Sequence, residues 1–96
     1  MTHNYFIYIL SNKNRTVLYI GVTKDILVRL EQHKITKTGF AFRYNCFDLV
    51  YYEHFKYINE AIAREKQLKR WSRIKKDTLI KSKNAELKNL IAEIKY

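Results

Sequence analysis

The chain has 96 residues, which suits one compact domain, and 47% of them are hydrophobic, which excludes a disordered chain. Nineteen Lys and Arg residues against nine Asp and Glu give a formal net charge of +10, which attracts polyanions. Nucleic acid is therefore the expected partner, rather than a membrane, because no apolar run is long enough to span or anchor. A solvated basic surface that binds nothing in particular is the alternative.

Cysteine usage and the first residues bear on location. Cys46 is the only cysteine, so an internal disulfide is impossible and a reducing compartment fits best. The apolar stretch 5–10 lacks the basic flank and the length of a signal peptide. The cytoplasm is the expected location.

The first third of the chain predicts a hairpin followed by a helix. Residues 5–10 and 16–22 are rich in aromatic and β-branched side chains and are typical of strands, joined by a polar turn at 11–15. Both strands are apolar at successive positions, which indicates a sheet covered on both faces. Asp25 favours a helix start, and the spacing predicts a helix over 24–34.

The remainder predicts a loop, one more strand and several helices. Residues 35–45 are expected to form the loop, and 47–53 form the third strand. Asn59 can cap a helix that runs to about residue 70, and Ser72 can start another. Asn84 is expected to begin a final helix, whose apolar face comprises Leu87, Leu90, Ile91 and Ile94.

Glu65 is the most informative residue in the predicted helix after Asn59. It lies three residues after Ile62 and three before Leu68, on or beside the apolar stripe. A carboxylate there needs a metal ion or an arginine to offset its desolvation. Alternatively, it reaches water or pairs with Lys69. The predicted inward face of this helix comprises Ile58, Ala61, Ile62 and Leu68.

Three further side chains are candidates for chemistry. Arg29 lies on the polar stripe of the first helix and offers a planar fork of donors suited to a phosphate, or else pairs with Asp25 in solvent. Tyr8 and Tyr19 lie on the two hairpin strands, ten residues apart. A tyrosine hydroxyl can position a water, although buried tyrosines in strands are more often core residues.

Four short motifs occur in an order that resembles the GIY-YIG nuclease family. Phe6-Ile7-Tyr8 and Tyr19-Ile20-Gly21 resemble the two motifs that name it, and Arg29 with His33 matches its following helix. The run 60–69 resembles its metal-site helix, with Glu65 in the ligand position. The segment 71–76 is similar to the tail of short stand-alone bacterial members called URI-domain predicted endonucleases. The chain is accordingly interpreted as one domain over 1–96, with a motif core at about 5–70 and C-terminal helices at about 72–96.

This resemblance implies an α+β fold with a small three-stranded antiparallel sheet flanked by helices. It implies one divalent cation, Mg²⁺ or Mn²⁺, on Glu65, with Arg29 stabilising charge on the phosphate. Tyr8 and Tyr19 would handle the attacking water, and His33 would assist proton transfer or hold the phosphate.

The expected activity is phosphodiester hydrolysis in nucleic acid, with DNA as the substrate, by a monomer or weak dimer. Selectivity for nucleic-acid structure and a link to repair or recombination are further expectations. The alternatives are a catalytically silent basic nucleic-acid-binding module and a basic RNA-associated protein with no active site.

The sequence departs from the family pattern at two places. Phe6 stands where the first motif has glycine, a site that is mostly structural. Val22 stands where some repair members have lysine, so a proton-transfer scheme through such a lysine is not expected here. The family's late asparagine has a candidate in Asn84, which helix capping explains equally well.

Basic and aromatic residues around these motifs are candidates for substrate contact. Phe42 and Tyr44 either stack on unpaired bases or pack beneath the loop. The expected phosphate contacts are Lys24, Lys34, Lys37, Arg43, Lys69, Arg70 and Arg73.

Overall fold

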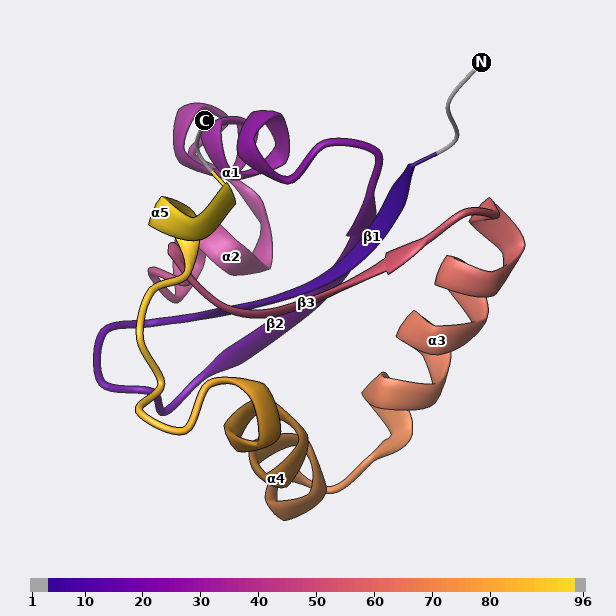
Figure 1. The fold of residues 1–96 in the computed structure, drawn as a ribbon. Helices are drawn as coiled ribbons and strands as arrows, with labels where there is room; N and C mark the ends of the chain where they lie inside the picture. The colour runs from indigo at the N-terminus through magenta and orange to yellow at the C-terminus, as the bar shows by residue number, and fades with distance from the viewer. Residues whose placement is uncertain (1–3, 95–96) are drawn as a thin grey trace.

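The computed structural model describes residues 4–94. Its centre is a three-stranded antiparallel sheet in which β1 (Tyr5–Ser11) lies between β2 (Leu18–Thr23) and β3 (Asp48–Phe55) (Figure 1). Helices flank this sheet, so the predicted α+β fold with a small antiparallel sheet is confirmed.

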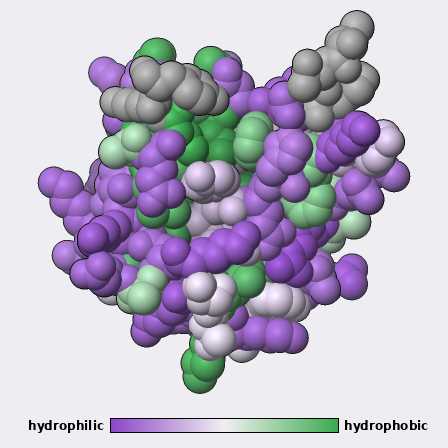
Figure 2. All heavy atoms as spheres, viewed as in Figure 1, coloured by the Kyte–Doolittle hydropathy of each residue, from purple (hydrophilic) through white to green (hydrophobic). Residues whose placement is uncertain are grey.

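The helices cover both faces of the sheet. One face carries α1 (Ile26–Ile35), α2 (Gly39–Arg43) and α5 (Ile91–Ile94), and the other carries α3 (Ile58–Arg70) and α4 (Arg73–Lys83) (Figure 1). None of the helices within 4–94 is long and apolar enough to cross a membrane. Hydrophilic residues cover most of the face shown in Figure 2.

The alternation of side chains along β1 gives the molecule two hydrophobic cores. Ile7 and Ile9 are buried in the core beneath α3 and α4, whereas Tyr8 and Leu10 are buried in the core beneath α1 and α2. All four side chains are 0% exposed. The sequence predicted a sheet covered on both faces, and this is why successive residues of the central strand are apolar.

The segment expected to be a loop contains α2, so that part of the prediction was wrong. The helix has five residues and begins at Gly39, whose φ of 85° is one that glycine adopts without strain. Ala41 is buried in the core, and its carbonyl accepts a 2.8 Å hydrogen bond from the Cys46 amide. A helix this short has too few residues for a periodic pattern, and the contacts that hold it are tertiary.

Helix α3 differs from its prediction at its start and on its inward face. It begins at Ile58 with Tyr57 in the capping position, so Asn59 lies inside the first turn. Ala61 and Leu68 are buried as predicted, but Ile58 and Ile62 are 41% and 38% exposed. Helix α3 therefore buries two of the four residues of its predicted inward face, Ala61 and Leu68.

The prediction of a final helix from Asn84 was wrong. Asn84 instead follows the last turn of α4, is 6% exposed, and organises a turn. Its Nδ2 donates to the carbonyls of Val50 (3.0 Å) and Lys88 (2.8 Å), while its Oδ1 accepts from the Lys88 amide (3.0 Å). The helix that does form is α5, and residues 95–96 of the predicted helix lie outside the described residues.

The C-terminal segment covers the start of β3, which is an edge strand. The Leu90 amide donates to the Leu49 carbonyl (2.7 Å), and Asn89 Oδ1 accepts from the Leu49 amide (3.1 Å). Leu87 packs in the core beneath α4, whereas Leu90 packs in the core beneath α1. The apolar residues assigned to one helix face are therefore divided between the two cores, and the edge of the sheet is protected from pairing with another chain.

We predict that Asn84→Ala lowers the free energy of unfolding by roughly 2–4 kcal/mol, because it leaves the buried Val50 carbonyl and the carbonyl and amide of Lys88 without their partner. Urea denaturation followed by circular dichroism measures the change. Ser82→Ala, at an exposed position two residues earlier, serves as the control and should cost under about 1 kcal/mol. Equal effects of the two substitutions would contradict this account of Asn84.

Candidate active site on the α1 face

Tyr8 and Gly21 are paired across β1 and β2, and the tyrosine ring fills the space above the glycine. A Cβ atom built on Gly21 would lie 2.4 Å from the Tyr8 hydroxyl oxygen and 2.5 Å from Cζ, distances that real Cβ atoms essentially never show. The absence of a side chain at Gly21 is therefore what lets the phenol lie flat over β2. This contact explains why the two short motifs act together: the tyrosine of the first needs the glycine of the second.

Helix α1 brings His33 to the hydroxyl of Tyr8. The Tyr8 oxygen lies 3.0 Å from His33 Nε2, so one hydrogen bond joins residues 25 positions apart and fixes the imidazole ring. The Tyr19 ring packs edge-on against the same imidazole, with centroids 5.2 Å apart. Two tyrosines and one histidine, all singled out in the sequence, therefore meet at one place.

The surroundings set the protonation of this cluster. Burial raises the pKa of the Tyr8 phenol to about 12, against the opposing effect of the nearby Arg29 guanidinium. Burial, together with the charge on Arg29, holds the pKa of His33 below its usual value of 6.5. At neutral pH the phenol therefore keeps its proton and the imidazole is neutral, which makes His33 the better proton acceptor of the two.

Arg29 lies beside this pair and is not neutralised by a carboxylate. The expected alternative partner, Asp25, instead caps α1 by accepting from the Val28 amide (3.2 Å). Arg29 Nη1 donates to Gln32 Oε1 at 3.2 Å, while its Nε is buried and has no hydrogen-bond partner among the described residues. A buried donor without a partner is costly unless a ligand supplies an acceptor.

A pocket of about 220 Å³ opens at this cluster and is lined by Tyr19, Arg29 and His33 among others. That volume is below the range typical of sites for drug-sized ligands, and its donors suit a small anion such as a phosphate group. Sequence reasoning did not single out the other lining residues, Gln32 and Phe40 among them. The spacing of Gln32, three residues after Arg29 on one helix, was the only signal for the first.

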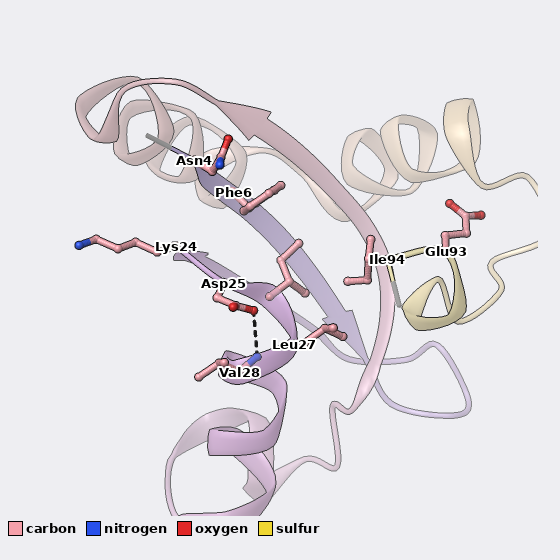
Figure 3. A pocket seen from close by; sticks show the side chains of 9 residues that line it. Asn4, Phe6, Lys24, Asp25, Leu27, Val28, Glu93 and Ile94 are labelled. Atoms are coloured by element: carbon pink, nitrogen blue, oxygen red, sulfur yellow. Dashed lines mark hydrogen bonds between the residues drawn. The ribbon is translucent and has the colours of Figure 1, made fainter. Parts of the chain in front are cut away.

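A larger cavity lies elsewhere, near the start of α1 (Figure 3). Its volume is about 670 Å³, and it contains none of the residues of the tyrosine cluster. The Asp25 carboxylate at its edge is bonded to the Val28 amide, and the Lys24 side chain extends away from the apolar residues (Figure 3).

Glu65 lies on α3, which packs against β1 and β2 on the sheet face opposite Tyr8. Its carboxylate pairs with Lys69 at 3.6 Å, the alternative that helical spacing allowed, and its side chain is 20% exposed. Among residues 4–94, no cluster of three or more His, Cys, Asp or Glu side chains could hold a metal. The cluster of Tyr8, Tyr19, Arg29 and His33 is thus assembled without Glu65.

The predicted phosphate contacts are spread over three regions. Lys34, Lys37 and Arg43 are exposed near the end of α1 and around α2, whereas Lys69 and Arg70 are exposed at the end of α3. Lys24 lines the cavity of about 670 Å³ near the start of α1.

Arg73 is engaged within the protein. It pairs with Asp77 (2.9 Å) and donates to the carbonyls of Arg15 and Thr16, so it ties the start of α4 to the β1–β2 turn. Its guanidinium is therefore less available to a phosphate than the sequence suggests.

Comparisons with known proteins show which family this chain is similar to. A family model described as the GIY-YIG catalytic domain matches residues 4–77. A UPF0213 protein from Bacillus pumilus (strain SAFR-032) is 33% identical over 85 residues, which cover 88% of this chain and 86% of the relative. The solution NMR structure of a UPF0213 protein from Bacillus halodurans has 30% sequence identity and a TM-score of 0.59, with 97% of this chain and 99% of that chain covered.

We predict that Gly21→Ala lowers the free energy of unfolding by roughly 1–3 kcal/mol, because the added methyl group collides with the Tyr8 ring. In a Tyr8→Val background the same substitution should cost much less, and urea denaturation of the four proteins measures this coupling. Gly39→Ala is the control: its Cβ meets nothing within 4 Å, so its cost comes from the positive φ alone and should not depend on Tyr8. An equal cost of Gly21→Ala in both backgrounds would refute the contact.

The raised pKa of Tyr8 predicts a loss of stability in alkali. The unfolded chain ionises near the usual value of 10, before the folded protein does near 12, so the stabilisation is complete below pH 10 and is lost as pH rises toward 12. Between pH 8 and pH 11 the native protein should lose roughly 1 kcal/mol more than Tyr8→Phe, which cannot ionise. Urea denaturation at the two pH values tests this, and parallel losses would contradict it.

Proposed function

The chain belongs to the GIY-YIG family of endonucleases, and from that premise we propose that it is a divalent-metal-dependent endonuclease that hydrolyses phosphodiester bonds in DNA. One observation carries the proposal: the hydrogen bond between Tyr8 and His33 lies beside Arg29, whose Nε is buried without a partner. A proton acceptor and an unsatisfied cationic donor at the mouth of one small pocket are what phosphodiester hydrolysis requires of a protein.

The proposed division of labour follows from burial and charge. Neutral His33 takes the proton of the attacking water at Nδ1, in the tautomer whose Nε2–H donates to the Tyr8 hydroxyl oxygen, and this hydrogen bond holds the imidazole in place. Tyr19, half-buried and lining the pocket, orients the water. Arg29 faces the negative charge that grows on the phosphate oxygens, where a preorganised guanidinium lowers the barrier most. Tyr8 is in this scheme a positioning residue, because a phenol with a pKa of about 12 is a poor base near pH 7.

Glu65 fits the divalent cation that the family implies. Mg²⁺ usually keeps several waters and is bound through one or two carboxylates plus substrate phosphates, so a single glutamate is a suitable donor set. The competing ion pair with Lys69 is long at 3.6 Å, and the lysine side chain is 54% exposed, so solvent weakens it and a cation can displace it. When bound, the cation would supply Lewis-acid stabilisation of the phosphoryl and leaving oxygens.

We place the DNA backbone along β2, an edge strand of the sheet, where the α1 face and the α3 face meet. Tyr19 packs with the Tyr8 core and the next residue, Ile20, packs with the α3 core, so β2 is the line where the two faces meet. Helix α3 contacts this strand from one side, while the tyrosine cluster lies on the other. In the proposed complex the phosphodiester lies at this edge, with Arg29 on one side of the strand and Glu65 on the other.

We expect metal-dependent nicking of supercoiled plasmid and of branched DNAs, abolished by chelator. Arg29→Ala and Glu65→Gln should each lower the rate by about 100-fold or more, because each removes a group that stabilises the transition state. Gel electrophoresis of the products, with magnesium or manganese, measures the rates, and circular dichroism checks that the variants are folded.

Glu60→Gln is the matched control for Glu65→Gln, since it makes the same change at an exposed position in the first turn of the same helix, and it should keep most of the activity. Tight, salt-sensitive DNA binding by the native protein without any cleavage would overturn the nuclease proposal. That result would leave a catalytically silent basic binding module, for which the charge of +10 is sufficient.

The lowered pKa of His33 predicts the acid side of the pH profile. As pH falls, His33 becomes protonated and can no longer accept a proton, so kcat/KM should fall about tenfold per pH unit below a midpoint that lies under 6.5. Initial rates at saturating magnesium between pH 5 and pH 8 measure this midpoint. A midpoint above 6.5 would show that His33 is not the neutral acceptor proposed here.

A further inference from the structure

Helix α2 presents two aromatic rings to solvent beside the proposed active site. Phe40 is 46% exposed and Tyr44, directly after the helix, is 42% exposed, with ring centroids 4.6 Å apart. The Arg43 guanidinium lies 5.8 Å from the centroid of the Tyr44 ring. We call Phe40, Arg43 and Tyr44 the α2 platform. Adjacent aromatic rings left in water usually mark a surface that binds something.

The platform is continuous with the proposed active site. The Phe40 ring stacks on the Tyr19 ring, with centroids 6.0 Å apart and planes 26° from parallel, and Tyr19 in turn contacts His33. Thr38, Gly39 and Phe40 line both the small pocket and an adjoining groove of about 590 Å³. A row of rings therefore leads from the proton acceptor out to the platform, and a ligand in one pocket extends naturally into the other.

The chemistry of the groove identifies a nucleobase as its occupant. Lys37 and Arg43 also line it, so a flat aromatic surface is combined with two cations suited to a neighbouring phosphate. In a duplex the faces of the bases are covered by their neighbours, so a stacking surface gains contact only from a base that is unpaired. Phe42 does not take part, since it is half-buried and packs near Phe47 (6.2 Å between centroids), in contrast to the stacking role considered from sequence.

We propose that the α2 platform binds an unpaired nucleobase close to the cleaved phosphate, so that the protein selects nucleic acid that is single-stranded beside the cut. This inference rests on the proposed nuclease function and adds to it a substrate class and a set of specificity residues. Phe40 and Tyr44 stack the base, and Lys37 and Arg43 hold its backbone.

The binding test uses the native protein with a chelator present, so that no cleavage is needed. The probe is a short single-stranded DNA in which 2-aminopurine replaces one adenine, since stacking on an aromatic ring quenches its fluorescence. We expect quenching with the native protein, and about tenfold weaker binding for Phe40→Leu and for Tyr44→Leu, because base stacking is typically worth 1–3 kcal/mol per base. The same probe in a duplex should bind with little quenching and should not distinguish the variants.

Tyr57→Leu is the matched control, because Tyr57 is 55% exposed but lies at the start of α3. It should bind the probe as the native protein does, and urea denaturation confirms that all three variants are folded. Folded platform variants that bind and quench the single-stranded probe as well as Tyr57→Leu does would overturn the proposal.

Cleavage assays separate this inference from the proposed function. If the native protein cuts DNA, platform variants should raise KM for single-stranded and gapped substrates about tenfold while changing kcat less. Equal cleavage of paired and unpaired DNA, unchanged in the variants, would overturn the platform and leave the nuclease intact. Quenching that depends on Phe40 and Tyr44 in a protein that cuts nothing would support the platform and overturn the nuclease.

Discussion

The placement of the Tyr8 ring over Gly21 is the contact on which the rest of the site depends. The ring is 0% exposed and occupies space that any side chain at position 21 would fill. Because the ring is packed inside the core beneath α1 and α2, it cannot move without disturbing that core. Its hydroxyl is therefore a fixed point, and His33 is oriented from it through a 3.0 Å hydrogen bond. Tyr8, in the core, thus fixes the orientation of the half-buried His33.

Electrostatics follow from the same geometry. Burial keeps the phenol protonated, whereas burial and the charge on Arg29 keep the imidazole neutral, so the acid and the base of the pair are assigned by their surroundings. No carboxylate among residues 4–94 pairs with Arg29, because Asp25 is used to cap α1. The positive charge of this side chain is therefore directed at whatever anion enters the pocket, and the excess of basic residues elsewhere on the chain favours a polyanion.

The sequence was sufficient to predict the sheet and the four residues that meet in the site. It was insufficient where a helix is very short or where a residue bonds to a part of the chain far away in the sequence. Period and composition predicted the strands and α1, and motif spacing predicted Tyr8, Tyr19, Arg29 and His33. Helix α2 was missed because five residues hold no periodic signal. Asn84 was assigned to a helix start because capping is a local pattern, whereas its actual bonds reach Val50, 34 positions away. The roles assigned to these residues, and to Glu65, stay predictions, because neither the fold nor the relatives test them.

The central claim is that His33 is a neutral imidazole held by Tyr8, and NMR titration of its ring tests that claim without any assay of activity. With ring nitrogens labelled, the native protein should show a His33 pKa below 6.5, and Tyr8→Phe should shift the Nε2 resonance because it loses its partner. A His33 pKa at or above 6.5, with ring signals that are unchanged in Tyr8→Phe, would contradict the account.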